Sequence, residues 1–327
     1  MIYTDPLYGS FAINDPAVLA LLESPAVQRL KGVLQHGVTA LIEITRPTTR
    51  FEHSLGVMVL VGRLGGKRRE QIAALLHDVS HTAFSHVIDY VFENHNGQNY
   101  HDEHKERFMA GTNLPDVLAQ FGLDWRDFLE ESHFPLLEQP APRLCADRLD
   151  YFLRDSLDLG LATADQVAAA LDRLIVFQGR IAVDDLEAAR WLADTYMAAD
   201  EASWANFREV GLYELAARAI RYALSAGILG EEDIWGTDRE VWSKMQASAD
   251  PKLPAMLALV KASTHFVWDD ERPDFRVSTK LRTLDPDVFS GGGLRSLSEL
   301  DPAFGRRREA YLARKAGKWP MRVLSTS

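Results

Sequence analysis

The stretch LLHDVSHTAFSHVID, residues 75–89, is the most informative part of this chain. It overlaps the end of an apolar run, IAALL at 72–76, which predicts a helix. His77 and Asp78 then stand where that helix ends. Neighbouring helical side chains point about 100° apart, so both can reach one ion only beyond the helix terminus. The stretch therefore predicts a site at the end of a helix rather than along its face.

Two further residues extend this site. His53 begins one predicted helix and Asp147 lies within another, and ligands from separate helices of a bundle can converge on a central ion. Imidazole and carboxylate groups together suit a divalent first-row metal. The structural alternative is a buried histidine that is hydrogen-bonded to an aspartate without any metal. Seven of the ten histidines lie between residues 77 and 133, and this clustering favours the metal hypothesis.

Most of the chain is predicted to be helical, because apolar residues recur at three-to-four spacing. The predicted helices cover residues 16–23, 25–34, 53–64, 68–77, 84–93, 114–121, 125–131, 143–157, 165–174 and 184–226. A hairpin is predicted at 173–183, with Gln178 and Gly179 at its turn. The fold class is thus mainly α, with a mixed α/β extension at the C-terminus. We expect a helical core over residues 1–230 and the extension, packed on it, over 231–327.

Composition narrows the class of protein. The chain has 327 residues, 46% of them hydrophobic, and a formal net charge of −11, which disfavours a dedicated nucleic-acid binder. Its one cysteine, Cys145, excludes an internal disulfide. The N-terminal residues lack the pattern of a signal peptide, and no apolar run is long enough for a membrane span. We therefore expect a cytoplasmic protein without a membrane partner.

Three motifs in fixed order resemble one known family. They are RFEHS at 50–54, LLHDVSHTAFSHVID at 75–89 and ADRLDYFLRDS at 146–156. Together they resemble the HD phosphohydrolase superfamily, and within it the deoxynucleotide triphosphohydrolase branch of bacterial dGTP triphosphohydrolases and the animal SAM-and-HD-domain dNTPase. DPLYGSFAI at 5–13 and SPAVQRLKGVLQHG at 24–37 also resemble that branch. The resemblance spans roughly residues 3–160 and implies an HD-type helical bundle whose motif region is 50–160.

The resemblance also implies a role for each matching residue. The implied ligands of one divalent metal ion (Mn, Fe, Co, Ni, Mg or Zn) are His53, His77, Asp78 and Asp147. The implied catalytic residues are His81, His86, Asp89 and His104, with His101 as the competitor of His104. The implied substrate contacts are Arg50, Gln35, Arg148, Tyr151 and Asp155. The resemblance further implies a homo-oligomer.

Elementary chemistry agrees with several of these roles, although alternatives remain. Asp89 could orient a histidine that carries a proton near neutral pH, and Arg50 could bind phosphate oxygens. Asp147, Tyr151 and Asp155 share one helix face. Arg148 and Asp155 could instead form a surface ion pair, and Tyr151 could be a core residue.

Some positions depart from the pattern of that branch. His36 follows Gln35 where an apolar residue is common, which leaves the choice between ribose and deoxyribose open. Val79-Ser80 replaces the commoner Leu-Gly. No SAM domain is present in this sequence, so the allosteric nucleotide site of the animal enzyme is not implied.

The sequence supports three functional hypotheses. The first is a metal-dependent nucleotide phosphohydrolase, foremost a (d)NTP triphosphohydrolase that gives nucleoside and tripolyphosphate, with stepwise phosphatase action close behind. The second is a phosphodiesterase on a cyclic or signalling nucleotide. The third is a non-catalytic nucleotide sensor, which would not need to keep all four ligands and the nearby histidines.

Overall fold

A computed structural model describes residues 1–324 and consists mainly of helices. The helices are α1 (Pro16–Glu23), α2 (Pro25–Arg29), α3 (Val38–Leu41), α4 (Arg50–Arg63), α5 (Arg68–Leu76), α6 (Val87–Val91), α7 (Tyr100–Glu103), α8 (Lys105–Ala110), α9 (Leu114–Ala119), α10 (Ala146–Asp158), α11 (Ala164–Leu171), α12 (Leu186–Ala199), α13 (Phe207–Ser225), α14 (Asp238–Gln246), α15 (Leu253–Leu257), α16 (Leu297–Leu300) and α17 (Pro302–Lys315). Among the described residues, no helix is long and apolar enough to cross a membrane.

The strands form three small sheets. The strands are β1 (Ile2–Asp5), β2 (Gly9–Ala12), β3 (Leu174–Phe177), β4 (Arg180–Val183), β5 (His265–Trp268), β6 (Phe275–Val277), β7 (Asp287–Ser290), β8 (Gly293–Ser296) and β9 (Trp319–Leu324). They pair as β1-β2, β3-β4-β7-β8 and β5-β9-β6. The prediction of a mainly helical chain with mixed structure towards its C-terminus is confirmed, with the addition of the N-terminal hairpin β1-β2.

The hairpin predicted at 173–183 is confirmed. Strands β3 and β4 pair antiparallel, with Phe177 opposite Arg180. The two turn residues, Gln178 and Gly179, both have positive φ, as a tight two-residue hairpin turn requires. Strand β7, from the C-terminal extension, then joins β4 in parallel. This sheet attaches the extension to the helical core.

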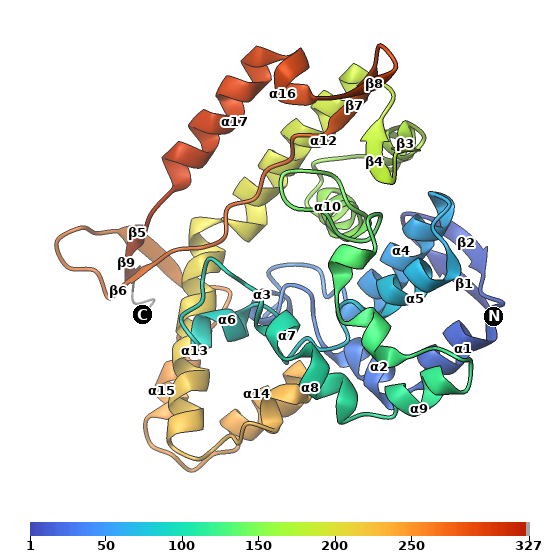
Figure 1. The fold of residues 1–327 in the computed structure, drawn as a ribbon. Helices are drawn as coiled ribbons and strands as arrows, with labels where there is room; N and C mark the ends of the chain where they lie inside the picture. Colours follow the sequence, from blue (N-terminus) through green and yellow to red (C-terminus); the bar gives the residue numbers. More distant parts are fainter. Residues whose placement is uncertain (325–327) are drawn as a thin grey trace.

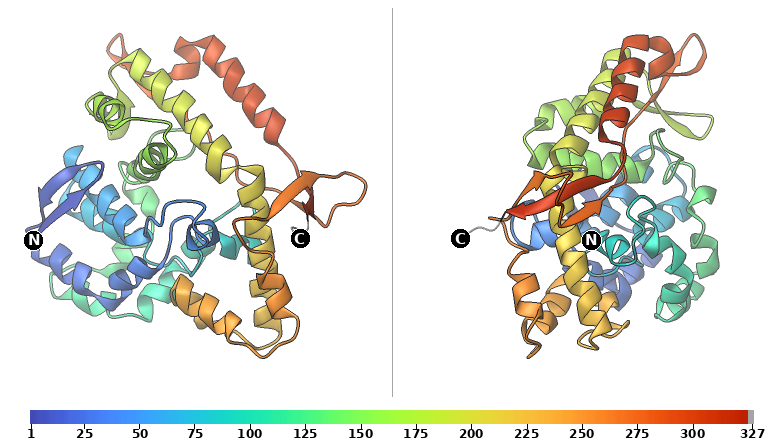
Figure 2. Two further views of the ribbon diagram at one scale, coloured as in Figure 1. Left: turned by 180° about the vertical axis from the view of Figure 1, so that it is seen from behind. Right: turned by 90° about the vertical axis from the view of Figure 1, so that its left-hand side faces the viewer.

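Helices α12 and α13 run end to end through the molecule, with the N-terminal half on one side and the β5-β9-β6 sheet on the other (Figures 1 and 2). The prediction of one continuous helix over 184–226 is wrong at its centre. A π-helical turn at Asp200–Trp204 interrupts it, and Asn206 caps the second helix by accepting from the backbone N–H groups of Arg208 and Glu209. The turn aims Ser203 and Trp204 into a cavity, where a regular helix would continue.

The predicted helix at 84–93 is shorter than expected. Phe84 and Ser85 both have positive φ, which a helix cannot accommodate, so α6 starts only at Val87. The loop between α5 and α6 is instead held by Asp238, whose carboxylate accepts the backbone N–H groups of Phe84 at 2.7 Å and Leu34 at 3.0 Å. A residue of the C-terminal extension thus fixes the loop that carries the histidines.

Two buried apolar clusters support these elements. The larger one joins α1, α4, α5, α10 and α12 with residues 284–304. The smaller one joins α6 and α13 with α14, α15 and the β5-β9-β6 sheet. Both clusters draw on residues from each side of position 230, so the boundary between core and extension stays a prediction.

Candidate metal centre and active site

The four expected metal ligands converge at one point in the structure. Nε2 of His53 lies 2.9 Å from Oδ1 of Asp147, 3.3 Å from Nε2 of His77 and 3.6 Å from Oδ2 of Asp78. Nε2 of His77 lies 3.5 Å from both Asp147 and Asp78. His53, His77 and Asp78 are buried and Asp147 is partly exposed. The sequence separates these residues widely, yet the fold brings their donor atoms together.

Three helix ends create this convergence. Thr49 and Glu52 form a capping box that starts α4 just before Arg50 and places His53 in its first turn. Helix α5 ends at Leu76, so His77 is its C-cap residue, as the sequence predicts. Asp147 lies in the first turn of α10, which packs against α4.

Both imidazoles present Nε2 to the centre because their other nitrogens are occupied. Nδ1 of His53 is 2.8 Å from Oδ1 of Asp150, and Nδ1 of His77 is 2.7 Å from the carbonyl oxygen of Ala74. A carboxylate and a carbonyl accept hydrogen bonds, so Nδ1 keeps its proton in each ring, and the proton on Nε2 is the one that a metal ion would displace. This is the arrangement that a metal-binding histidine needs.

The charges of the site also fit a cation. Burial alone would lower the pKa of His77, but the Asp78 and Asp147 carboxylates outweigh it and raise the pKa to about 10. Burial would likewise raise the pKa of Asp147, but hydrogen bonds with His53 and His77 hold it well below its usual range. The cluster thus binds positive charge strongly, and two imidazoles with two carboxylates suit a divalent first-row metal. The donor set does not decide which metal that is.

Asp78 also contacts the predicted phosphate-binding arginine. Nη1 of Arg50 lies 2.7 Å from Oδ2 of Asp78, and its Nε donates to Oγ of Ser85 at 3.0 Å. Both side chains of the Arg50–Asp78 pair are buried. Arg50 is therefore held at the edge of the metal cluster, with part of its guanidinium already engaged.

Three histidines form a second group beside the metal cluster. The rings of His81 and His101 stack with centroids 3.8 Å apart, and His86 meets both edge-on. Burial lowers the pKa of His81, of His86 and of His101, that of His101 to about 3, so all three are neutral imidazoles. Nε2 of the buried His81 lies 3.2 Å from Oδ1 of Asp78, and its Nδ1 has no hydrogen-bond partner among the described residues.

The histidine group and Asp78 could be taken for a second metal site, but the ring geometry argues against it. Ligand atoms of Asp78, His81 and His101 lie within 4.8 Å of one another. However, the two rings are tilted by only 17° from parallel. The in-plane lone pairs of stacked rings do not converge on one ion, so we assign these histidines to proton transfer and substrate contact instead.

The structure separates His104 from its competitor His101. His104 stacks on Tyr100 and its Nδ1 lies 2.9 Å from the Tyr100 carbonyl oxygen, outside the cavity that contains the metal cluster. His101 lines that cavity. The geometry therefore favours His101 over the predicted His104, and the catalytic role of either histidine stays a prediction. Asp89 supports the group as expected, because its Oδ2 lies 3.1 Å from Nδ1 of His86.

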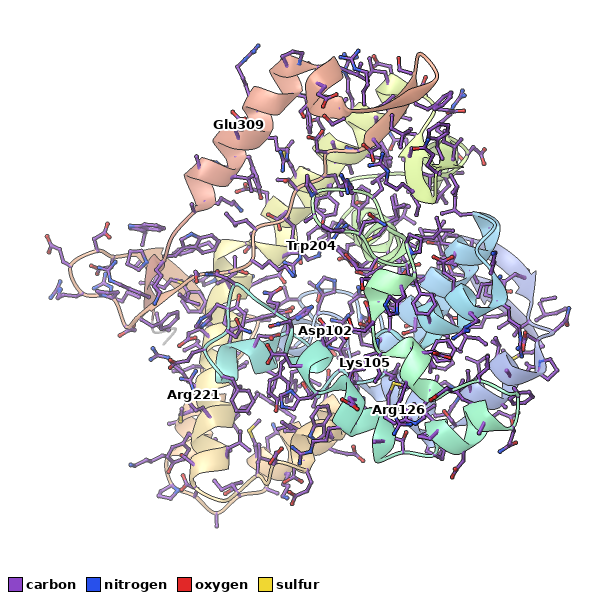
Figure 3. The ribbon with its side chains drawn as sticks, viewed as in Figure 1. Asp102, Lys105, Arg126, Trp204, Arg221 and Glu309 are labelled. Carbon is purple, nitrogen blue, oxygen red and sulfur yellow. The ribbon has the colours of Figure 1, made fainter. Side chains whose placement is uncertain are left out.

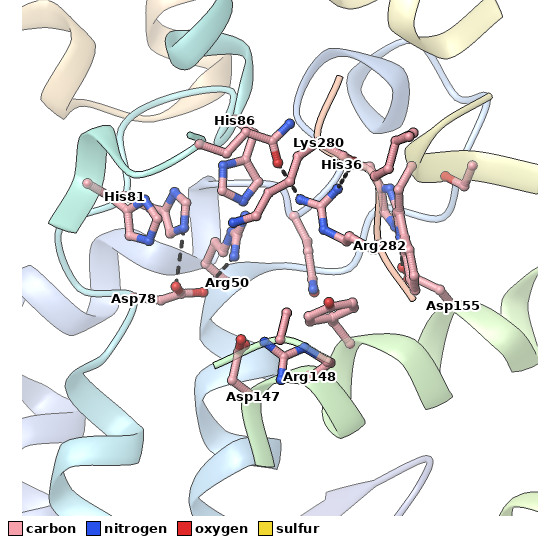
Figure 4. A pocket seen from close by; sticks show the side chains of 18 of the residues that line it. His36, Arg50, Asp78, His81, His86, Asp147, Arg148, Asp155, Lys280 and Arg282 are labelled. Carbon is pink, nitrogen blue, oxygen red and sulfur yellow. Dashed lines mark hydrogen bonds and ion pairs between the residues drawn. The ribbon is translucent and has the colours of Figure 1, made fainter. Parts of the chain in front are cut away.

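The metal cluster lies at one side of a cavity of about 360 Å³. The five predicted substrate contacts all line this cavity: Gln35, Arg50, Arg148, Tyr151 and Asp155. Figure 4 shows Asp147 and Arg148 on one side of this space and His36 and Asp155 on another. Figure 3 places two other lining residues, Asp102 and Trp204, near the middle of the molecule.

Several of these contacts have protein partners that the sequence did not indicate. Oδ1 of Asp155 is 2.9 Å from Nε2 of His36, and Nε1 of Trp204 donates to its Oδ2 at 2.7 Å. The Arg148 guanidinium lies 3.3 Å from Oε1 of Glu138 and also donates to backbone carbonyls. The expected alternative of an Arg148–Asp155 surface pair is therefore not observed. Tyr151 shares a 2.5 Å hydrogen bond with the buried Tyr196.

Sequence reasoning missed two kinds of residue. Asp150, which orients His53, lies three positions after Asp147 on α10, and this spacing could have indicated it. Lys280 and Arg282 reach the cavity from the C-terminal extension. Their spacing was the one signal in the sequence: Lys280 and Arg282 are two positions apart in TKLRT, at 279–283, and such side chains point to the same side of an extended segment.

The fold and the site together define a class of protein. Residues 50–155 match the HD domain family, and these residues include the four residues that we expect to bind the metal. The chain belongs to the HD superfamily of metal-dependent phosphohydrolases, and it is a hydrolase.

Individual relatives support this assignment. The chain is 37% identical over 321 residues to the metal-dependent phosphohydrolase cns2 of Cordyceps militaris, covering 95% of this chain and 92% of that protein. It is 25% identical to the deoxynucleoside triphosphate triphosphohydrolase SAMHD1 of Gallus gallus, over 49% of this chain and 34% of that one. A phosphohydrolase structure from Bacteroides thetaiotaomicron shares the fold, with a TM-score of 0.67 at 17% identity over 98% of this chain and 99% of that one.

Proposed function

We propose that this protein hydrolyses nucleotides at the phosphate ester bond next to the sugar, foremost as a (d)NTP triphosphohydrolase that releases nucleoside and tripolyphosphate. The convergence of His53, His77, Asp78 and Asp147 at one side of a partly open cavity carries this proposal. One relative is a deoxynucleoside triphosphate triphosphohydrolase, although it matches only half of this chain. This relative supports triphosphohydrolase activity over other kinds of nucleotide hydrolysis.

In the proposed mechanism the four ligands would hold one divalent ion. Such an ion lowers the pKa of water and polarises a phosphoryl oxygen. Arg50, fixed by Asp78 and Ser85, offers its remaining donor capacity to a phosphate oxygen of the substrate. These residues thus position the ester phosphate and offset the charge that develops on it.

The neutral histidines manage protons. His86 is oriented by Asp89, and Asp89 is itself fixed by the backbone N–H of Tyr100 at 3.0 Å. A neutral histidine held this way can take a proton at Nε2 from the attacking water and then pass that proton to the leaving sugar oxygen. His81 and His101 line the same wall, and Nδ1 of His81 is available to water or phosphate.

The opposite wall would hold the nucleoside. Tyr151 offers a ring and Gln35 a side-chain oxygen that has no partner in the protein. Asp155 accepts from His36 and Trp204, so the three side chains form a rigid polar unit that can meet a sugar hydroxyl. His36 occupies this unit instead of an apolar residue, and selection against ribose is therefore not part of the proposal.

A second candidate is stepwise phosphatase action, which one observation favours. Four carboxylic acids line the cavity besides those already assigned: Asp102, Glu131 and Glu138, which we call the acidic wall, and Glu209. Burial and the neighbouring Glu131 raise the pKa of Asp102 to about 7, so this wall resists additional negative charge. A substrate with a single phosphate would meet less repulsion there than a tripolyphosphate group.

Product identification tests both candidates. We would incubate metal-stripped protein with nucleotides and deoxynucleotides, add Mn, Mg, Co, Ni, Fe or Zn in turn, and separate the products by chromatography. Asp78→Ala is the inactive variant, and Asp158→Ala, an exposed change on α10, is the control. Nucleoside with tripolyphosphate supports the first candidate, and nucleoside with orthophosphate supports the second. Binding without turnover under any metal would reject both in favour of a sensor, and cleavage of cyclic nucleotides alone would indicate a phosphodiesterase.

The expected homo-oligomer also remains a proposal. Light scattering coupled to size-exclusion chromatography measures it directly, with and without nucleotide.

A further inference from the structure

The segment at 279–283 crosses from the β5-β9-β6 sheet to the β3-β4-β7-β8 sheet and lines the cavity on its way. It contributes two positive side chains, Lys280 and Arg282, which Figure 4 shows across the space from Asp147 and Arg148. The metal cluster and this segment therefore face the same space, although more than a hundred residues separate them in the chain.

The contacts of these two cations are unusual, because none of them is with a carboxylate. Arg282 donates to the carbonyl oxygen of Lys280 at 3.2 Å and to the side-chain oxygen of Gln98. Nζ of Lys280 lies 3.3 Å from the carbonyl oxygen of Gly97. Among the described residues, no carboxylate oxygen lies within the 4.0 Å that defines an ion pair with either cation. The nearby Asp200 accepts a hydrogen bond from Tyr311 at 2.7 Å, and its charge helps to raise the pKa of Arg282 without forming a direct ion pair.

The other two cations of the cavity differ in this respect. Arg50 pairs with Asp78, and Arg148 pairs with Glu138. Lys280 and Arg282 thus form no direct ion pair with a carboxylate among the described residues, although the neighbouring tyrosines and Asp200 outweigh burial and raise the pKa of Arg282. Burial and the nearby Arg282 and Arg148 guanidinium groups lower the pKa of Lys280, which means that the cations repel one another. Lys280 is exposed at the cavity mouth and Arg282 is half-buried. A half-buried arginine without a carboxylate partner is well placed to bind an anionic ligand.

The partners of these cations also fix their positions. Gln98 is buried, and it lies in the loop between α6 and α7, close to the histidine group. Backbone carbonyls and an amide can hold a cation in place without neutralising it. The segment is therefore organised before any ligand arrives, as efficient anion binding requires.

We propose that Lys280 and Arg282 bind the phosphate oxygens of the nucleotide that extend beyond the phosphate group at the metal cluster. The inference rests on the proposed function in one respect, since it takes the substrate to be a nucleotide. It assigns recognition of the polyphosphate chain to the C-terminal extension, outside the residues that match the HD domain family. The two unpaired cations then balance the acidic wall of Asp102, Glu131 and Glu138.

A measurement of anion binding tests the proposed role of Lys280 and Arg282 and does not require turnover. We would titrate the full chain in EDTA with inorganic tripolyphosphate and with orthophosphate by calorimetry, and repeat this for Arg282→Gln and Lys280→Gln. The control is Arg276→Gln, which removes an exposed arginine of the same extension. We expect tripolyphosphate to bind more tightly than orthophosphate, and each cavity variant to weaken tripolyphosphate at least 10-fold with the control unchanged.

Several outcomes would overturn the inference: no tripolyphosphate binding by the unmodified protein, equal affinities for the two anions, or cavity variants that bind like the control. Thermal unfolding provides a second readout. If Arg282 serves a ligand, tripolyphosphate raises the melting temperature of the unmodified protein and of Arg276→Gln more than that of Arg282→Gln, whereas equal shifts in all three would overturn the inference. If turnover of every nucleotide fails while anion binding follows the expected pattern, the proposed function fails and this site stands.

Discussion

Nδ1 of His53 lies 2.8 Å from Oδ1 of Asp150, one helical turn beyond the ligand Asp147 on α10. The same helix thus supplies one ligand to the metal cluster and orients another ligand on α4. Asp150 is in turn held by Arg154, which also pairs with Asp5. This buried chain of charges connects the N-terminal hairpin to the metal cluster.

We predict that Asp150→Asn weakens metal binding by about 10–100-fold, because an amide no longer fixes the His53 tautomer as a carboxylate does. Stability should fall by about 1–3 kcal/mol, since Arg154 keeps Asp5 as a partner. Calorimetric titration with Mn or Zn measures the affinity. Asp158→Asn, on the exposed part of α10, should leave it unchanged, and an unaltered affinity in Asp150→Asn would contradict the proposed role.

Gly56 determines how closely α4 approaches α10. A Cβ atom at this position would collide with the side chains of Arg154 and Asp150. We predict that Gly56→Ala destabilises the protein by about 1–3 kcal/mol through overpacking and also weakens metal binding. Chemical denaturation and metal titration measure the two effects. Gly111→Ala is the matched control, because a Cβ there meets only ordinary contacts.

Asp238 should make the stability depend on pH. Burial outweighs the hydrogen bonds from Phe84 and Leu34 and raises the pKa of Asp238 to about 7, from an ordinary value of 3.8. A carboxyl whose pKa is higher in the folded state stabilises the fold fully below pH 4, and this contribution is lost as pH rises through about 7. By linkage the loss amounts to at most about 4 kcal/mol.

The Asp238→Asn variant isolates this contribution, because its amide does not titrate. We predict that the unfolding free energy of the unmodified protein falls relative to that of Asp238→Asn between pH 4 and pH 8. Denaturant titrations at several pH values measure the difference. A difference that stays constant over this range would show that Asp238 is already ionised in the folded protein at low pH.

The metal cluster could be anticipated from sequence because its ligands belong to short motifs at helix ends. His77 and Asp78 had to lie beyond the end of their helix, and they do. The residues that the C-terminal extension adds to the cavity and its supporting loops could not be predicted from such motifs. Lys280, Arg282 and Asp238 act through tertiary contacts with loops near residues 34, 84 and 98, and no local pattern encodes such contacts.

The break between α12 and α13 illustrates the same limit. Apolar residues recur at three-to-four spacing throughout residues 184–226, and this pattern predicts one continuous helix. The π-helical turn at Asp200–Trp204 is stabilised by tertiary contacts instead, among them the bond from Trp204 to Asp155. Such turns are frequent at functional sites, and here the turn supplies part of the cavity wall.

His101 and His104 provide the sharpest test of the catalytic geometry. His101 stacks on His81 inside the cavity, whereas His104 stacks on Tyr100 outside it. We predict that His101→Ala lowers kcat by about 10²-fold or more, within the usual range for loss of a positioned acid–base group. His104→Ala should change kcat less than about threefold, because its ring does not face the substrate space. Steady-state kinetics on whichever nucleotide the product screen identifies, with circular dichroism to confirm folding, measures both. The reverse ranking would return the catalytic assignment to His104 and would require the loop before α7 to move when substrate binds.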